Sequence, residues 1–403
     1  MASPVYLFGP FRLDVAERRL SRGDVTLPLR LKVFDTLRVL VENAGRLMTK
    51  DELLQAIWPD TAVEENNLNH NVSTLRKVLG DRATGQSFIE TVPRVGYRFV
   101  APVETEGAAA HAAPPRRLTP RQEIRYCTTP DGVRLAYAQS GSGRPLVKAS
   151  NWLTHLDFEW ESPIWRHWWE ALSRHHRLLR YDERGNGLSQ RDVAGVSFET
   201  WVRDLETVVD AAGLDRFALL GISRGASIAI AYTVRHPERV SHLVLFGGFA
   251  AGLNHTGTPA DLAARRALND LIRLGWGLNN PAFCKVFTCR FIPRATPAHE
   301  AWFDELQRVS TSPENAARLM EADDAIDVRT LLPQVRVPTL VVHCDDDRVA
   351  LPEQGRQLAA AIPGARYVSL PSANHLPLDT EPAWPILLEE LGVFLGWEAA
   401  SAV

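Results

Sequence analysis

The segment Gly221-Ile222-Ser223-Arg224-Gly225 places a serine between two glycines, directly after the apolar run FALLGI and directly before the helical pattern ASIAIAYTVRHP. The order strand, tight turn, helix is what a G-x-S-x-G nucleophile elbow requires. Small residues are needed because the turn is strained and packs close to its neighbours. Ser223 is therefore predicted to stand at a helix N-terminus as a nucleophile.

A serine hydroxyl needs a base that takes its proton, and the base needs an oriented partner. Two later strands supply such side chains, since Asp345, Asp346 and Asp347 follow TLVVHC and His375 follows RYVSL. The order nucleophile, acid, histidine is the one expected when each group follows a later strand. Ser223, one aspartate of this run and His375 are therefore predicted to form a catalytic triad.

These side chains need a scaffold, and from residue 123 onward predicted strands alternate with helical stretches. The predicted strands are IRYCTT, VRLAYAQSG, PLVKAS, RLLRYD, FALLGI, HLVLFG, TLVVHC and RYVSL. The alternation favours an α/β fold with a mostly parallel, doubly wound sheet. Residues 249–332 interrupt the strand pattern and are predicted to form several helices.

The first hundred residues follow another pattern. Short apolar runs in residues 5–29 predict a small antiparallel sheet, and apolar periodicity predicts helices near 31–45, 49–58 and 66–80. Thr49 and Glu52 have the spacing of a capping box. The segment FIETVPRVGYRFVAP then predicts a hairpin, so the layout is that of an α+β winged helix-turn-helix.

In a winged helix the third helix enters the major groove and the wing reaches an adjacent groove or the backbone. Periodicity assigns four leucine and valine positions of this helix to the core: Leu68, Val72, Leu75 and Leu79. The outward face then carries Asn66, His70, Asn71, Ser73, Thr74 and Lys77, with Arg76 at its flank. These side chains suit contacts with base edges and phosphates. On periodicity alone, an ordinary solvated helix face fits equally well.

Residues 105–122, TEGAAAHAAPPRRLTPRQ, are rich in Ala and Pro and show no apolar periodicity. They are predicted to be a linker between a domain at 1–104 and a domain at 123–403. The total of 403 residues is itself too long for one ordinary core.

Composition narrows the classes further. The net charge of the chain is -3, and residues 1–104 hold 14 Lys and Arg against 13 Asp and Glu, so DNA binding must rest on a local patch. No apolar run approaches the roughly 20 residues of a membrane span, and no signal-peptide pattern opens the sequence. The four cysteines are scattered without C-x-x-C spacing. We expect a cytoplasmic protein without a metal site or a cofactor.

The pattern LNHNVSTLRKVLGD followed by FIETVPRVGYRFV resembles the DNA-binding domain of OmpR-like transcriptional regulators, over nearly all of residues 5–102. The resemblance implies that double-stranded DNA is a partner. In that family DNA is approached by the positions that match Asn66, Asn71, Ser73, Thr74 and Arg76 of the helix and Thr91, Arg94 and Tyr97 of the wing. Asn, Ser and Thr stand here where relatives often carry Arg, which implies fewer phosphate contacts and a weaker salt dependence.

Residues 123–398 resemble the α/β-hydrolase superfamily, in the elbow, in the order of the triad and in RYDERGNGLSQ, which matches its D-x-R-G-x-G-x-S turn. The resemblance favours Asp347 as the acid, with Asp345 as the alternative, because Val349–Pro352 matches the stretch that follows the acid. It implies that Ser223 attacks a carbonyl, that His375 moves the proton and that Asp347 orients His375. It also implies that residues 249–332 form a lid over the site.

Relatives usually carry His-Gly after the third strand, where backbone N–H groups help to build the oxyanion hole. Residues 148–152 of this chain read Lys-Ala-Ser-Asn-Trp instead. By position, the N–H groups of Trp152 and Arg224 are expected to form the hole. Trp152 and Phe158 are expected to line an apolar pocket.

Three functions fit these expectations. The first is a DNA-binding regulator whose hydrolase-like domain senses, and also hydrolyses, a small acyl, ester or lactone ligand. The second is a serine esterase or lactonase with an accessory DNA-binding domain, and the third is a catalytically silent dimerisation platform. A homodimer is expected if the operator holds tandem or palindromic half-sites.

Overall fold

The protein is described from a computed structural model, which covers residues 5–23, 25–58, 65–80, 88–92, 95–106, 122–277 and 281–397. The chain divides into two compact units, Met1–Arg117 and Leu118–Val403. Each unit has its own hydrophobic core, so each is considered by itself.

The N-terminal unit begins with an antiparallel sheet. Its strand order is β4-β3-β2-β1-β8, formed by β1 (Val5–Phe8), β2 (Phe11–Asp14), β3 (Arg19–Arg22), β4 (Val25–Leu27) and β8 (Glu104–Glu106). Strand β8 pairs with β1, with Thr105 opposite Tyr6. The predicted linker is therefore wrong at its first two residues, which pair in this sheet, and residues 107–121 of it lie outside the described part.

Three helices and a second sheet complete this unit. The helices are α1 (Leu31–Glu42), α2 (Lys50–Ile57) and α3 (Glu65–Leu79), and the sheet has the order β5-β7-β6, from β5 (Leu47–Thr49), β6 (Ile89–Val92) and β7 (Gly96–Phe99). The capping box predicted at Thr49 and Glu52 is present. The four apolar side chains predicted for the core side of α3 are buried: Leu68, Val72, Leu75 and Leu79. The winged-helix prediction is confirmed, with β5 as a strand that the sequence did not reveal.

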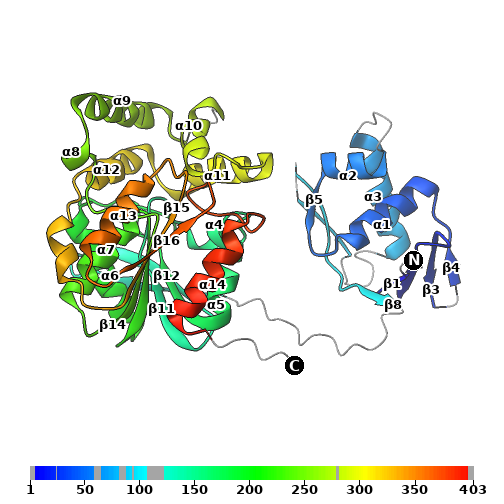
Figure 1. Ribbon diagram of the computed structural model, residues 1–403. Helices are drawn as coiled ribbons and strands as arrows, with labels where there is room; N and C mark the ends of the chain where they lie inside the picture. The colour runs from blue at the N-terminus through cyan, green and yellow to red at the C-terminus, as the bar shows by residue number, and fades with distance from the viewer. Residues whose placement is uncertain are drawn as a thin grey trace. The chain divides into compact units, whose positions relative to one another are not determined.

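The C-terminal unit is built on an eight-stranded sheet of order β16-β15-β14-β13-β11-β12-β10-β9 (Figure 1). The strands are β9 (Glu123–Thr128), β10 (Arg134–Ser140), β11 (Arg144–Lys148), β12 (His176–Tyr181), β13 (Phe217–Ile222), β14 (Val240–Phe246), β15 (Thr339–Cys344) and β16 (Arg366–Leu370). All pairings in the row β16-β15-β14-β13-β11-β12 are parallel. Strand β10 pairs antiparallel with β12 on one side and with β9 on the other. All eight predicted strands are present.

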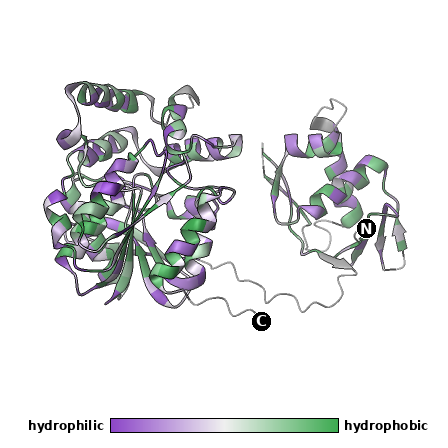
Figure 2. Cartoon of the chain, in the orientation of Figure 1, coloured by the Kyte–Doolittle hydropathy of each residue, from purple (hydrophilic) through white to green (hydrophobic). Residues whose placement is uncertain are grey.

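Helices flank this sheet on both sides, as Figure 1 shows. They are α4 (Leu156–Trp160), α5 (Arg166–His175), α6 (Phe198–Ala211), α7 (Arg224–Arg235), α13 (Pro352–Ala361) and α14 (Ala383–Leu395). The central strands β13 and β15 are buried along their whole length, which explains their unbroken apolar runs, and Figure 2 shows the same hydrophobic interior. The tryptophans of the α5 region, Trp165, Trp168 and Trp169, are part of this core.

The helical insertion that was predicted to be a lid, and is called the lid below, enters between β14 and β15 and gathers at one end of the sheet (Figure 1). It comprises α8 (Leu253–Thr256), α9 (Pro259–Gly275), α10 (Pro281–Phe291), α11 (Pro297–Ser310) and α12 (Pro313–Asp324), followed by the 3₁₀ helix Arg329–Gln334. Three of these helices begin with a hydroxyl N-cap and a proline, at Thr258, Thr296 and Ser312. Such a pair fixes the first turn, because the hydroxyl accepts a free N–H and proline lacks one.

Within the described residues, no helix is long and apolar enough to cross a membrane. The same residues contain no cluster of three His, Cys, Asp or Glu side chains arranged to hold a metal ion.

Candidate active site and candidate DNA-binding face

Ser223 forms the turn between β13 and α7. Its φ is 54° and its ψ is −127°, a backbone conformation that is strained for any residue other than glycine. Gly221 and Gly225 permit the turn, because a Cβ on either one would lie 2.5 Å or 2.7 Å from backbone atoms. The predicted elbow geometry is therefore present, with Ser223 held at the start of α7.

His375 and Asp347 lie in contact beyond the ends of β16 and β15. The Nδ1 of His375 and the Oδ2 of Asp347 are 2.6 Å apart, and both side chains are almost fully buried. The Nε2 of His375 is buried and has no hydrogen-bond partner among the described residues. His375 and Ser223 line the same small cavity. His375 and Asp347 of the predicted triad are therefore in contact, and Ser223 lines the same cavity as His375.

The carboxylate of Asp347 is fixed on all sides. Its Oδ1 accepts the backbone N–H groups of Val349 and Ala350, at 2.8 and 3.2 Å. Burial raises the pKa of the Asp347 carboxyl, but the charge and hydrogen bond of His375, with help from His343, outweigh burial and hold this pKa well below its usual range. Asp347 is thus suited to stay ionised beside an imidazolium.

Asp345, the alternative acid, is placed elsewhere. Its carboxylate accepts a hydrogen bond from the Ser369 hydroxyl, and its side chain is exposed. The nearby His343 was missed by sequence reasoning. Its Nε2 lies 3.5 Å from the Oδ2 of Asp347 and 2.8 Å from the carbonyl oxygen of Ala350. No signal in one sequence separates His343 from an ordinary strand residue of TLVVHC.

The loop after β11 packs directly against the elbow. A Cβ on Gly225 would lie 2.7 Å from the carbonyl oxygen of Ser150, so the two segments touch through their backbones. In this loop Trp152 is followed by Leu153, whose φ is 57° although it is not a glycine. The close approach is compatible with the predicted oxyanion donors, Trp152 and Arg224, which belong to these two segments.

Lys148 stands at the base of this loop, where its buried ammonium donates to the side-chain carbonyl of Asn151. It also lies over the rings of Trp165 and Trp169, each centroid 5.8 Å away. Desolvation lowers the pKa of Lys148 to about 8, although Glu159 opposes this effect. A buried side chain therefore holds the loop that in relatives carries His-Gly.

Arg224 ties the elbow to the lid. Its guanidinium donates to Glu183 and, at 2.8 Å, to Asp323 of α12, and it lies 4.0 Å above the Trp201 ring. Burial raises the pKa of Glu183 to about 7 against the opposing charge of Arg224. The residue after the nucleophile is therefore anchored through its side chain.

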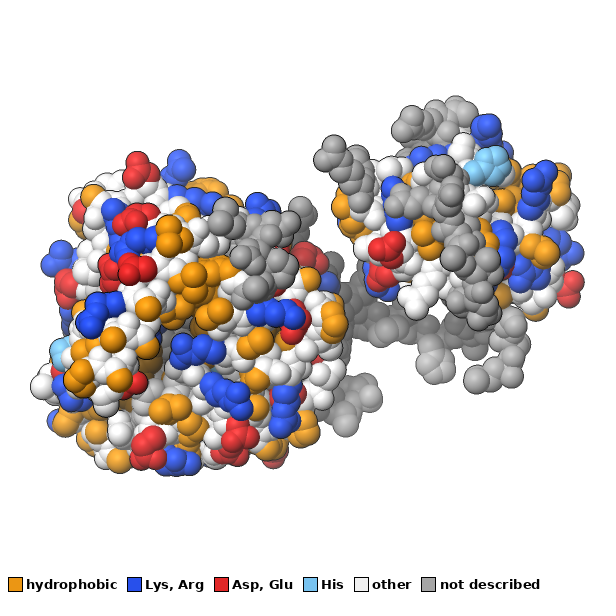
Figure 3. All heavy atoms as spheres, turned by 90° about the horizontal axis from the view of Figure 1, so that it is seen from above, with side chains coloured by type: hydrophobic (Ala, Val, Ile, Leu, Met, Phe, Trp, Pro, Cys, Tyr) orange, Lys and Arg blue, Asp and Glu red, His pale blue; other side chains and the backbone are white. Residues whose placement is uncertain are grey.

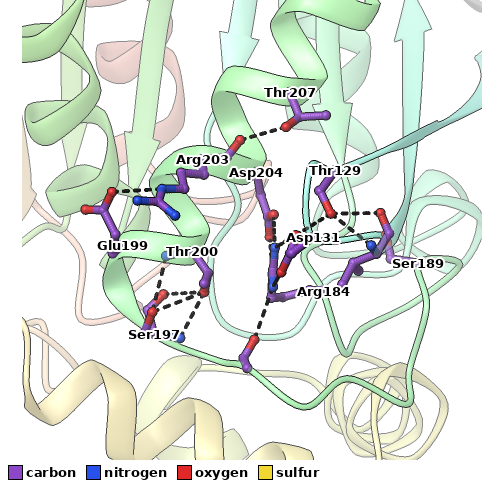
Figure 4. A network of polar contacts seen from close by, with 12 residues as sticks. Thr129, Asp131, Arg184, Ser189, Ser197, Glu199, Thr200, Arg203, Asp204 and Thr207 are labelled. Carbon is purple, nitrogen blue, oxygen red and sulfur yellow. Dashed lines mark hydrogen bonds and ion pairs between the residues drawn. The ribbon is translucent and has the colours of Figure 1, made fainter.

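The turn that matches D-x-R-G-x-G-x-S is held by a second arginine (Figure 4). Arg184 pairs with Asp204 of α6 at 2.5 Å and with Asp131 at 2.7 Å, and Figure 4 shows it between the two carboxylates. Within the same turn, Asp182 accepts the N–H groups of Leu156 and Leu188. These contacts fix the segment beneath Glu183, so the turn supports the site without lining either cavity that Ser223 borders.

Two cavities meet at Ser223. The smaller is lined by Ser223, His375 and mostly apolar side chains, among them Trp152, Phe291 and Leu306. The larger has a volume of about 600 Å³ and opens beneath the lid. Trp152 lines both, as predicted. Phe158 lines neither of these two cavities and stacks on Trp302.

The larger cavity is not the apolar pocket that the sequence led us to expect. Charged side chains from the lid and from the segment after β15 line it together with apolar ones. Figure 3, which views the molecule from above Figure 1, shows Lys and Arg groups interspersed with apolar side chains on this face of the unit. The lid therefore adds charges that lie far from Ser223 in the sequence.

The exposed face of α3 carries neutral polar groups and the cation Lys77. Ser73 and Lys77 are exposed, and the Thr74 hydroxyl donates to the carbonyl oxygen of His70. Asn67 and Asn69, which sequence reasoning did not single out, are exposed as well. The side chain of Asn66 lies outside the described residues.

Asn71 faces the core, so the prediction of an outward-facing Asn71 is wrong. Its side-chain amide donates to the Lys32 carbonyl oxygen at 3.1 Å and to the Thr36 hydroxyl at 3.0 Å, both on α1. Asn71 lies at the edge of the apolar stripe of α3. At such a position a small rotation of the helix decides whether the side chain points to the core or to the solvent. A buried amide needs such partners, and both of its donors are occupied here.

The wing is tied to α3 by two side chains predicted to approach DNA. Arg76 donates to the Thr91 hydroxyl at 2.7 Å and to the Ile89 carbonyl oxygen at 2.8 Å. The Tyr97 hydroxyl donates to the side-chain oxygen of Asn69 at 2.7 Å, and its ring is buried. Arg94 lies outside the described residues.

The C-terminal unit has an eight-stranded sheet flanked by helices and a serine at the turn from a strand into a helix. These features are those of a hydrolase-like α/β domain. In this chain the domain follows a winged helix. Comparison with known families agrees: residues 158–382 match the alpha/beta hydrolase fold, and residues 24–99 match the C-terminal domain of transcriptional regulatory proteins. The chain belongs to the alpha/beta hydrolase family, and N-terminal to that domain it carries an OmpR-like winged helix.

Individual relatives cover the hydrolase domain. The chain is 27% identical over 253 residues to the AB hydrolase superfamily protein YisY of Bacillus subtilis (strain 168), which covers 62% of this chain and 91% of that protein. It is 27% identical over 284 residues to the non-heme chloroperoxidase CPO-A1 of Kitasatospora aureofaciens, covering 66% and 98%. The solved enol-lactonase from Burkholderia xenovorans LB400 is 28% identical with a TM-score of 0.56, covering 68% of this chain and all of that one.

Proposed function

We propose that this protein is a DNA-binding transcriptional regulator whose hydrolase domain binds and hydrolyses a small acyl ester or lactone. One observation carries the catalytic part: His375 contacts Asp347 through Nδ1 at 2.6 Å, its Nε2 has no hydrogen-bond partner among the described residues, and it lines a cavity together with Ser223. A base in that state can accept the proton of a serine hydroxyl as the hydroxyl attacks a carbonyl.

The proposed cycle uses groups of this chain at each step. The Ser223 oxygen bonds to the substrate carbonyl carbon while His375 takes its proton. The oxyanion is held by the N–H groups of Trp152 and Arg224, and Asp347 stabilises the imidazolium. His375 then gives the proton to the leaving alcohol as the ester bond breaks. Water, deprotonated by His375, next releases the acid and restores Ser223.

The regulatory part rests on the winged helix, since its family match is to a domain of transcriptional regulators. We propose that the exposed face of α3, with Ser73, Thr74 and Lys77, reads the major groove and that the wing meets the adjacent backbone. Few of these groups are charged. We therefore expect modest affinity with a shallow salt dependence, which a homodimer on paired half-sites would raise.

The catalytic part is tested by hydrolysis of 4-nitrophenyl esters from acetate to octanoate, by the full-length protein and by Ser223→Ala. Turnover by the wild type alone supports the proposal, and the preferred chain length measures the pocket. Turnover that survives Ser223→Ala contradicts it.

The regulatory part is tested by selecting bound sequences from random double-stranded DNA with the full-length protein. The affinity for the selected sequence is then measured with and without the best ester, using Ser223→Ala so that the ligand persists. A ligand-dependent change supports the regulator. Identical affinities would instead favour an esterase with an accessory DNA-binding domain.

A further inference from the structure

The cavity of about 600 Å³ beneath the lid is lined by four acidic and three basic side chains as well as by Ser223. What it can bind depends on which charges are already paired inside the protein. Two of the acids come from α12. Asp323 accepts from Arg224 at 2.8 Å, and Asp324 pairs with Arg265 at 2.9 Å. These two carboxylates are therefore neutralised by arginines of the same domain.

The other two acids also have partners. Glu353 of α13 pairs with Arg356 at 3.0 Å. Asp261 closes the capping box of α9, where its carboxylate accepts from the Thr258 N–H at 2.9 Å and from the Thr258 hydroxyl at 2.7 Å. Three of the four acids on the lining are thus paired with arginines, and Asp261 is held by hydrogen bonds within its capping box.

Two basic residues remain without a carboxylate. Neither Arg290 nor Arg348 has an ion pair with any described residue, and Arg290 donates at 3.3 Å to the backbone oxygen of Arg348. Desolvation and repulsion from Arg265 lower the pKa of the Arg290 guanidinium, although the charge of Asp347 opposes them. Both arginines are exposed and line the same cavity, so both guanidinium groups are open to an anionic ligand.

The chain holds this pair of cations beside the proposed triad. Arg348 directly follows Asp347 in the sequence. Arg290 precedes Phe291, whose backbone oxygen accepts the His375 N–H at 2.8 Å and whose ring meets the His375 imidazole edge-on at 5.5 Å. The end of α10 is therefore bound to the histidine segment.

We propose that Arg290 and Arg348 form an anion subsite, and that the substrate is an ester or lactone that carries a carboxylate some atoms away from its reacting carbonyl. The guanidinium fork matches a carboxylate through two parallel hydrogen bonds. Trp152 and Ser223 both line this cavity as well as the smaller one that His375 borders. This inference rests on the proposed hydrolase function and names its substrate class.

The kinetic test compares two esters of equal chain length, mono-4-nitrophenyl adipate and 4-nitrophenyl hexanoate, at constant ionic strength. The wild type is expected to prefer the adipate ester in kcat/KM. Arg290→Gln and Arg348→Gln should each lower the adipate-to-hexanoate ratio about tenfold, as expected for the loss of a charge-assisted contact. Arg266→Gln is the matched control, because Arg266 is an exposed arginine of α9 that does not line the cavity. Equal ratios in all four proteins overturn the proposal.

A binding test needs no turnover. Titration calorimetry with adipate is expected to show binding to Ser223→Ala and at least tenfold weaker binding to Ser223→Ala with Arg290→Gln. Adipate that fails to bind Ser223→Ala, or that binds both proteins equally, overturns the subsite. Arg290-dependent binding of adipate without any ester turnover would support the subsite and contradict the hydrolase function. Ester turnover with an unchanged adipate-to-hexanoate ratio would support the hydrolase function and contradict the subsite.

Discussion

The two candidate sites of this molecule are built in opposite ways. Around Ser223 each group is held by several others: the serine by a strained turn, Asp347 by two backbone N–H groups, and Arg224 by two carboxylates. On α3 the candidate DNA-contacting side chains Ser73 and Lys77 are exposed, whereas Asn71 is buried.

The difference follows from what each site has to do. Acyl transfer requires a nucleophile, a base and donors fixed before the substrate arrives, and burial supplies that fixation. Sequence readout requires donors and acceptors that are free to meet base edges, so they have to face water until DNA binds. Substitutions in the first site should therefore cause large losses of catalytic activity. Substitutions on α3 should have small effects or should change the stability of the domain.

The largest effect is expected from Asp347→Asn. The amide would favour the wrong imidazole tautomer and could not stabilise the imidazolium, so kcat for ester hydrolysis should fall by about 10⁴-fold. Steady-state kinetics on the best 4-nitrophenyl ester measures this change. Asp345→Asn is the matched control and should keep most of the activity, since Asp345 contacts Ser369 instead. Equal losses in both variants would contradict the assignment of the acid.

A smaller effect is expected from Gly247→Ala. Gly247 has a φ of 55°, and a Cβ there would lie 2.9 Å from the Cε1 of His375. The ring would have to move, and a shift of about 1 Å in a catalytic group can cost about 10²-fold in kcat. Gly364→Ala separates this contact from backbone strain, because Gly364 has a φ of 72° but no atom within 4 Å of its Cβ position. Activity that falls equally in both variants would contradict the steric account.

In the winged helix, Asn71→Ala should act on stability. The substitution leaves the Lys32 carbonyl oxygen and the Thr36 hydroxyl without this donor in a buried site, at a cost of about 1–3 kcal/mol in the free energy of unfolding. Differential scanning calorimetry of the full-length protein measures the loss. The exposed Ser73→Ala should change stability by less than about 0.5 kcal/mol. If Asn71→Ala left the stability unchanged and relaxed the sequence preference in DNA binding, the result would support the prediction that Asn71 contacts DNA.

A further effect, on the pH dependence of stability, concerns Lys148. Because desolvation lowers its pKa to about 8 in the folded protein, the unfolded chain holds more protons above that pH, and the wild type should gain stability as pH rises from about 8 toward the ordinary value of 10.5. Lys148→Met lacks this gain. Urea unfolding at pH 7 to 10, followed by tryptophan fluorescence, compares the two proteins. Parallel stability curves would show that the ammonium is not desolvated.

Sequence reasoning found what local patterns determine. The eight strands of the large sheet, the elbow and the capping box at Thr49 depend on neighbouring residues and were predicted. Strands β5 and β8 have three residues each and carry no periodicity to detect. Asn71 was misplaced because it lies at the edge of an apolar stripe. Arg290 and Arg348 are 58 positions apart, so only the folded lid reveals that they share a cavity with Ser223.

The central claim is that Ser223 is a nucleophile activated by His375 and Asp347. Labelling with a fluorophosphonate tests it without knowledge of the natural substrate, because the serine oxygen displaces fluoride and stays bound to phosphorus. Mass spectrometry of digested full-length protein should find one adduct, on Ser223. The adduct should form much more slowly in His375→Gln and be absent in Ser223→Ala. An unlabelled wild type, or labelling that proceeds as fast without His375, would contradict the account.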